Sequence, residues 1–205
     1  MKKSHSYLNQ IVLAVLVAVA CGCSRKDTSA LQEQTLDQGR ELSQNFMGSL
    51  KGRLVTVLEQ GGPVEAIEVC HRDAAAMADQ VSASHPGVLG VKRISPRWRN
   101  PSNQPDELDR AAWRLFEASL PVGPDEAEDL LVPDPVQEDH LVYYRALRMA
   151  PLCLTCHGPV DDIPADVRTA LAQRYPDDRA TGFQAGELRG LIRIDFESEK
   201  LAETD

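Results

Sequence analysis

The chain has 205 residues and a formal net charge of −9, from 22 basic and 31 acidic side chains. An acidic chain lacks the basic surface that nucleic acids attract, so we expect no nucleic-acid partner. The part that follows the N-terminal segment, about 170 residues, is long enough for one domain with a hydrophobic core.

The N-terminal residues have the features of an export signal. Met1-Lys2-Lys3 precedes the apolar run at 11–20, and small residues stand directly before Cys21. The run is far shorter than the roughly 20 apolar residues of a membrane-spanning helix, so we interpret residues 1–20 as a signal peptide. The sequence AVAC resembles a bacterial lipobox, which predicts lipid attachment at Cys21, with Cys23 as the alternative. A signal without lipid, either cleaved or kept as an anchor, is the other interpretation.

Export predicts a periplasmic protein, anchored by its lipid to a bacterial membrane. Residues 21–36 then hold the lipid-attachment cysteine and a polar tether that we expect not to pack. Residues 37–196 form the domain, and residues 197–205 form a polar tail. Loss of Lys2 and Lys3 with the signal changes the net charge from −9 to −11, because 20 basic residues then face 31 acidic ones.

Hydrophobic periodicity and turn residues predict helices first and separate strands later. Leu42, Phe46 and Leu50 recur at helical spacing, and Gly61-Gly62-Pro63 ends that helix. The expected helices are 36–60, 63–83, 106–119 and 165–174, and the expected strands are 88–95, 140–149 and 187–196. The proline-rich and acidic stretch 120–139 is expected to be mostly loop. This order predicts an α+β fold with an antiparallel sheet.

The stretch APLCLTCHGPV, residues 150–160, places Cys153, Cys156 and His157 close together. Such a group could form a metal knuckle, a redox pair or a haem anchor. A structural zinc site needs four ligands, and no second pair or HxxxH follows. A thioredoxin-like pair needs a βαβ setting that the preceding residues do not supply. A histidine directly after the second cysteine is the c-type haem attachment signature, so we predict one covalent haem at Cys153 and Cys156, with His157 on the iron.

A fourth residue of interest, Cys70, lies in the second predicted helix. It shares one helix face with Ile67, Ala74, Met77 and Val81. Free cysteine often packs in cores as a small hydrophobe, so ordinary burial is one interpretation. A second axial ligand is the other, and Met77 then competes with Cys70.

Four segments resemble, in this order, the PAS-like haem-binding family of Tll-type proteins: AIEVC, RISPRWRNPSNQPDELD, CLTCHG and TGFQAGELRGLIRI. The resemblance covers roughly residues 37–196. It implies a PAS-like α+β fold, with an antiparallel sheet flanked by N-terminal helices and one covalent c-type haem. It also implies axial ligation by the motif histidine and by a cysteine of the first helical region. At the matching positions these are His157 and Cys70.

The loop RWRNPSNQPD offers partners for the two haem propionates. Guanidinium groups pair well with carboxylates, so Arg97 and Arg99 are the candidates, with Arg93 on the preceding strand as a third. The alternative is that this segment only forms a rigid turn, with its asparagines bonded to backbone amides.

Two protein ligands on one haem would close both axial positions and argue against an enzyme. A thiolate ligand donates strongly and lowers the reduction potential. We therefore predict redox or ligand sensing, or single-electron transfer, with a redox or signalling protein as partner. The alternative is a haem enzyme, peroxidase-like or a small-molecule reductase, with an axial site that can be vacated.

Overall fold

The computed structural model of the protein describes the backbone of residues 4–118 and 128–197, and within these ranges the side chains from residue 29 onward. The helices are α1 (Ser4–Glu68), α2 (Ala74–Ser84), α3 (Glu107–Ala118), α4 (Leu154–His157) and α5 (Ala165–Arg174). A π-helical turn at Val69–Asp73 joins α1 to α2, and short 3-10 turns lie at Pro101–Asn103, Pro151–Cys153 and Val160–Asp162. The strands are β1 (Val88–Ile94), β2 (Asp129–Pro133), β3 (His140–Arg148) and β4 (Leu188–Glu197).

The four strands form one antiparallel sheet in the order β1-β4-β3-β2. Neighbouring residues of a strand face opposite sides of a sheet. Tyr143 of β3 accordingly packs in the cluster on one face, and Tyr144 packs in the cluster on the other. Both tyrosines are fully buried, so both faces of the sheet are covered.

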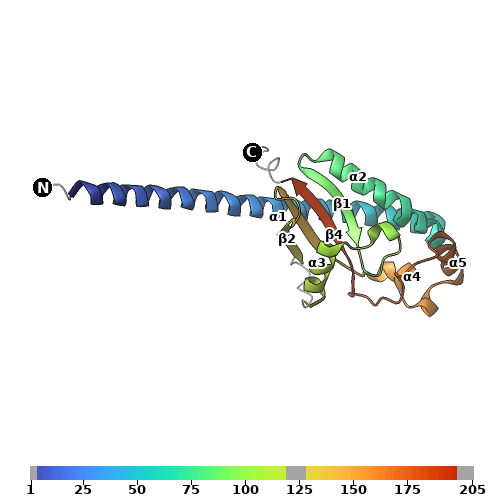
Figure 1. Ribbon diagram of the computed structural model, residues 1–205. Coiled ribbons are helices and arrows are strands. Elements are labelled where there is room, and N and C mark those ends of the chain that lie inside the picture. Colours follow the sequence, from blue (N-terminus) through green and yellow to red (C-terminus); the bar gives the residue numbers. More distant parts are fainter. Residues whose placement is uncertain (1–3, 119–127, 198–205) are drawn as a thin grey trace.

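Helices cover the sheet on both sides (Figure 1). On one face, Phe46 and Leu50 of α1 and Ala78 of α2 pack against strand residues that include Ile194. On the other face, Phe116 of α3 packs with residues of β1, β3 and β4. The predicted α+β fold, with an antiparallel sheet flanked by N-terminal helices, is confirmed.

Helix α1 begins earlier than expected, and the predicted break within it is confirmed. Gly62 has a φ of 78° and a ψ of −176°, which are not helical values, so two helical segments meet at a kink directly before Pro63. The predicted tether is also helical, and Leu31, Thr35 and Leu36 at its end contact or enter the core. The expectation that residues 21–36 do not pack is therefore wrong for this end. The side chain of Cys21 lies outside the described residues, so lipid attachment there stays a prediction.

The stretch 120–139 was expected to be loop, yet it contains strand β2. This strand pairs with β3, with Leu131 opposite Tyr143, at the edge of the sheet. It is five residues long and ends in Pro133, a residue that sheets tolerate at their edges. Residues 120–127 of the predicted loop lie outside the described part, as does residue 119, the last of the predicted helix 106–119.

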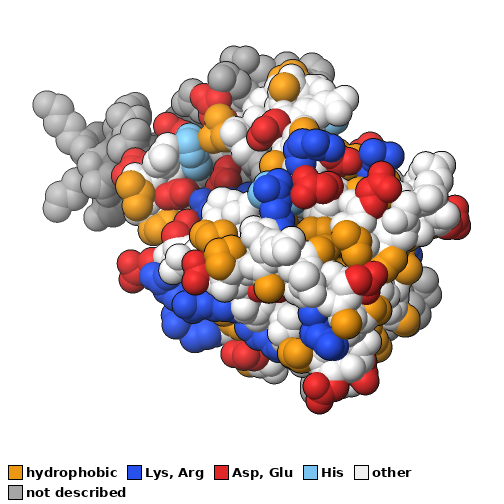
Figure 2. Space-filling view, turned by 90° about the vertical axis from the view of Figure 1, so that its right-hand side faces the viewer, with side chains coloured by type: hydrophobic (Ala, Val, Ile, Leu, Met, Phe, Trp, Pro, Cys, Tyr) orange, Lys and Arg blue, Asp and Glu red, His pale blue; other side chains and the backbone are white. Residues whose placement is uncertain are grey.

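Figure 2 shows one face of the molecule, on which basic and acidic side chains are interspersed. Within the described part of the chain, no helix has an apolar stretch long enough to cross a membrane.

Candidate functional site

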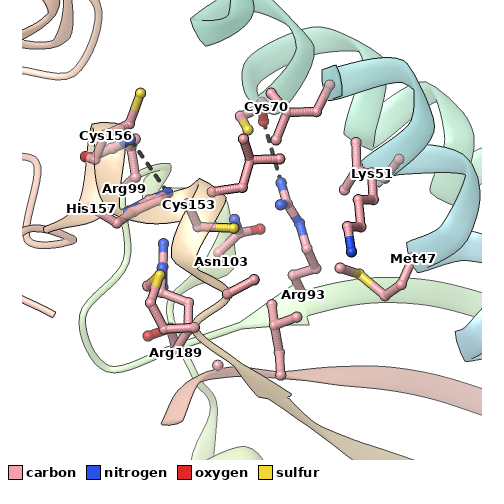
Figure 3. Close-up of a pocket in the computed structure, with 18 of the residues that line it drawn as sticks. Met47, Lys51, Cys70, Arg93, Arg99, Asn103, Cys153, Cys156, His157 and Arg189 are labelled. Atoms are coloured by element: carbon pink, nitrogen blue, oxygen red, sulfur yellow. Dashed lines mark hydrogen bonds between the residues drawn. The ribbon is translucent and has the colours of Figure 1, made fainter. Parts of the chain in front are cut away.

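The site is a pocket of about 180 Å³ at one end of the sheet. Its walls come from α1 and the π-helical turn, from the end of β1 and the loop after it, and from the segment that joins β3 to α4. Most of the wall is apolar, with Leu50, Leu54, Ile67, Trp98 and Met149 among its members. Figure 3 shows that the polar and sulfur-containing side chains enter this pocket from separate elements.

The CxxCH motif forms two successive short helical turns on one side of the pocket. Pro151 begins the first turn, as proline favours the first helical position, and Cys153 closes it. Cys156 and His157 lie on α4, which ends at Gly158. A Cβ at Gly158 would stand 2.6 Å from the Leu154 oxygen, so the turn requires glycine there. All three functional residues of the motif line the pocket.

A later segment of the chain holds the motif histidine in place. Nδ1 of His157 donates to the main-chain oxygen of Ala180 at 2.6 Å. The amides of Gly182 and Phe183 donate to the oxygens of Gly158 and His157, at 2.7 and 2.9 Å. Burial, followed by the charges of Arg99 and Arg189, lowers the pKa of His157 well below its usual value. The imidazole is therefore neutral, with the lone pair on Nε2.

Arg99, one of the two predicted propionate partners, lines the pocket but is already engaged. It pairs with Asp178 at 3.0 Å, and it donates to the oxygen of Cys156 at 2.6 Å and to that of Ala180 at 3.3 Å. Its Nη1 lies 3.5 Å from Nε2 of His157. Through these contacts, the loop after β1 holds the motif turn in place.

Arg97, the other predicted partner, does not line the pocket. It pairs with Glu187 at 2.9 Å, donates to the oxygen of Thr181 and stacks over the ring of Phe183 at 3.6 Å. These contacts agree with the alternative interpretation, in which this loop has a mainly structural role. Asn100 fits it as well, because its side chain accepts from the amide of Ser102 at 3.1 Å.

Cys70 lines the same pocket from the π-helical turn between α1 and α2. Such turns are rare and frequently mark functional sites, a feature that the sequence analysis missed. Met77, the competing candidate, packs against the main hydrophobic core instead. Cys70, Cys153 and Cys156 are all free thiols.

The two motif thiols lie in an environment that favours their neutral form. Burial raises the pKa of Cys153, and it raises the pKa of Cys156 to about 11. A negative charge on Cys70 would raise both pKa values further, so the three sulfurs are close enough to interact electrostatically.

Two pocket residues were missed as candidates, Lys51 and Arg189, and Arg93 was given only third place. Arg93 donates to the oxygen of Cys70 at 3.3 Å. Arg189, at the start of β4, donates to the oxygen of Arg97 at 3.1 Å. Lys51 comes from α1 (Figure 3). Nothing in the local sequence indicates Lys51 or Arg189, because the pocket forms only when α1, β1 and β4 meet.

The groups in the pocket fit the haem that the sequence predicts. A flat apolar tetrapyrrole suits apolar walls, and its iron suits a neutral imidazole and a thiol. The motif thiols match the attachment signature, and the cations match carboxylate groups. Among the described residues, no group of three or more His, Cys, Asp or Glu side chains is arranged to hold a metal ion by itself.

Comparison with known proteins gives a structural neighbour and a family. The crystal structure of the cyanobacterial heme-protein Tll0287 is similar to this chain with a TM-score of 0.56. The sequence identity is 24%, and the match covers 77% of this chain and 95% of that one. At this identity the likeness concerns the fold. No curated protein matches the chain. A sequence profile of the Tll0287-like family (Tll0287) matches residues 7–196, so the chain belongs to this family.

Proposed function

We propose that the protein carries one c-type haem, attached through Cys153 and Cys156, with His157 and Cys70 as axial ligands. The observation that carries this proposal is the meeting of these four side chains in one apolar pocket. The motif and Cys70 lie about 80 residues apart in the chain, which makes their meeting informative (Figure 3). The structural similarity to a cyanobacterial haem protein supports a haem-binding role.

The chain's own residues have defined tasks in such a site. The Ala180 oxygen fixes the tautomer of His157, so that Nε2 presents its lone pair. Arg99 holds the oxygen of Cys156 and thereby the orientation of the motif turn. The apolar walls exclude water. A bound haem supplies one-electron redox chemistry at its iron.

We propose a role in redox or ligand sensing or in single-electron transfer, rather than in catalysis, because the chain offers a ligand from each of two separate elements. For sensing, the position of Cys70 is favourable. The π-helical turn that contains it directly follows α1, and the N-terminal part of α1 extends away from the sheet (Figure 1). A shift of Cys70 would therefore act on α1, of which residues 21–68 remain after removal of the proposed signal, and a signalling partner could contact this helix.

We further propose that the protein is exported and held at a bacterial membrane by a lipid on Cys21. Support comes from the sequence pattern of residues 1–21. Covalent haem attachment requires free thiols at Cys153 and Cys156, and both are free in the structure.

Gel electrophoresis under denaturing conditions tests the attachment. After expression with a c-type maturation system, the wild-type protein should keep haem on the gel. Cys156→Ala should weaken attachment, and the double variant Cys153→Ala/Cys156→Ala should abolish it. Cys70→Ala should keep the covalent haem, since this thiol is assigned to the iron. Haem that survives in the double variant would refute the proposed attachment.

A further inference from the structure

Three cations of the pocket have no carboxylate partner among the described residues. They are Lys51, Arg93 and Arg189. The other arginines around the motif are paired: Arg97 with Glu187, Arg99 with Asp178 and Arg148 with Glu128, all within 3.0 Å. In a chain with nine more acidic than basic side chains, acids to pair with are plentiful. Lys51 is exposed and can be solvated, whereas Arg93 and Arg189 are partly buried, so the absence of acids around these two arginines is a specific property of the pocket.

The unpaired cations also repel one another. Burial, and then the charges of Arg93 and Arg99, lower the pKa of Arg189 to about 9. Among the described residues, Arg189 donates one hydrogen bond, to the oxygen of Arg97 at 3.1 Å, which leaves most of its five donors unused. Arg93 uses one donor, for the oxygen of Cys70. A buried cation without a counter-ion is costly, so the arrangement favours the binding of an anion.

The placement of the cations defines the shape of that anion. Arg93 lies next to the last residue of β1 and Arg189 next to the first residue of β4, and these two strands are neighbours in the sheet. Both side chains reach the pocket from the sheet side, while Lys51 reaches it from α1 (Figure 3). Planar guanidinium groups bind carboxylates with two parallel hydrogen bonds. The apolar walls require the rest of the ligand to be hydrophobic.

We propose that Arg93 and Arg189, with Lys51 as the third cation, bind the two carboxylates of the tetrapyrrole and set its orientation in the pocket. This inference rests on the proposed haem-binding function and replaces Arg97 and Arg99 in the role predicted from the sequence. Arg93 also donates a hydrogen bond to the main-chain oxygen of Cys70. The same side chain would therefore contact both a carboxylate of the tetrapyrrole and the residue proposed as an iron ligand.

Metal-free porphyrin tests the inference without any contribution from axial ligands. The full chain, produced without haem, is titrated with protoporphyrin IX and with its dimethyl ester, and binding is followed by fluorescence. The wild type should bind the diacid at least about tenfold more tightly than the ester, since only the diacid can form charge-assisted hydrogen bonds with the cations. Arg93→Gln and Arg189→Gln should each remove most of this preference and leave the affinity for the ester unchanged.

Arg114→Ala is the matched control, because Arg114 is an exposed cation on α3, which covers the other face of the sheet from α1 and α2. Arg114→Ala should bind the diacid and the ester with the same affinities as the wild type. Binding of the ester also reports whether each variant is folded. Equal affinity for diacid and ester in the wild type would overturn the inference and leave the proposed function standing. Failure of both porphyrins to bind would count against the proposed function itself.

Succinate is the second probe, since a free dicarboxylate has the same charged groups. We expect it to bind far more weakly than the porphyrin diacid, because it cannot use the apolar walls. Tighter binding of succinate, lost in Arg189→Gln, would make the cluster a site for small dicarboxylates and overturn the assignment.

Discussion

Nδ1 of His157 donates a hydrogen bond to the main-chain oxygen of Ala180 at 2.6 Å. A carbonyl oxygen only accepts, so this contact places the imidazole proton on Nδ1 and the lone pair on Nε2. The same relationship, a ligand histidine oriented by a carbonyl, is common in metal sites.

His157→Ala should keep the haem covalently attached and change its absorption spectrum from six-coordinate low-spin to high-spin. Attachment depends on the cysteines, whereas the spectrum depends on the axial nitrogen. Added imidazole should restore the low-spin spectrum by filling the space of the lost side chain. His140→Ala, at the start of β3 and away from the pocket, is the control. An unchanged spectrum in His157→Ala would remove this residue from the ligand set.

Cys70→Ser should abolish the electron paramagnetic resonance signature of low-spin thiolate ligation in the oxidised protein. The haem content should stay the same, because the motif cysteines are untouched. If the thiolate signature persists in this variant, another residue supplies the ligand.

Reduction should open the site to carbon monoxide. If Cys70 holds the iron as proposed, reduction would remove one positive charge beside it, and a thiolate in an apolar pocket would then be poorly stabilised. The reduced wild-type protein is therefore expected to bind carbon monoxide, and the oxidised protein to resist added ligands. Optical titration of both states provides the measurement. A reduced protein that refuses carbon monoxide would favour a plain electron carrier over a sensor.

Loading with haem should depend on export. Removal of residues 1–20 should yield colourless protein, since c-type attachment occurs outside the cytoplasm and these residues are the proposed export signal. Haem content per chain, measured with and without these residues, tests this. Equal content in the two preparations would contradict export as a requirement.

Gly39 of α1 lies against the ring of Tyr143. A Cβ at Gly39 would stand 2.5 Å from the Cδ2 atom of Tyr143, which is fully buried. Gly39→Ala should therefore lower the free energy of unfolding by about 1–3 kcal/mol, in spite of its better helix propensity. Gly48→Ala, in the same helix with open space around it, should raise this free energy by about 0.5–1 kcal/mol. Urea unfolding of both variants tests the contact, and equal effects would contradict it.

The start of α3 should make stability depend on pH. Burial raises the pKa of Asp106, but the amide of Asp109 and the charge of Arg193 outweigh it and lower the pKa overall. A carboxyl with a lowered pKa in the folded state stabilises the protein above its unfolded pKa, and this contribution is lost as the pH falls through the folded pKa. Asp106→Asn should therefore flatten the loss of stability between roughly pH 5 and pH 3. Asp161→Asn, at an exposed position, should not.

Much of the fold could be predicted from local patterns. The expected strands 88–95, 140–149 and 187–196 correspond to β1, β3 and β4, because their apolar runs are long. Helix α1 was predicted to begin too late, because its packed face extends upstream to Leu31 and Thr35 in a segment that is otherwise polar. Strand β2 was missed because its acidic and proline-rich surroundings conceal a short edge strand.

In the candidate site, too, some residues could be identified from the local sequence and others only from the folded structure. The motif residues could be identified from their spacing, and Cys70 from its helix face and the family resemblance. The structure brings these four residues and Arg99 to one pocket and leaves Arg97 outside it. Arg189 could not be identified beforehand, because its neighbours Arg93 and Arg99 are brought to it by the sheet. The ligand roles themselves stay predictions.

The π-helical turn at Val69–Asp73 has a consequence for how this site could arise or be lost. A π turn contains one residue more than an α turn, and each residue of an α-helix rotates the chain by about 100° about the helix axis. Deletion of a single codon in this turn would restore an uninterrupted α-helix, yet it would rotate α2 against α1 by that angle. Cys70 and the packed face of α2 could then no longer both keep their positions. Descendants of this gene are therefore expected to tolerate substitutions around the turn far better than changes in its length.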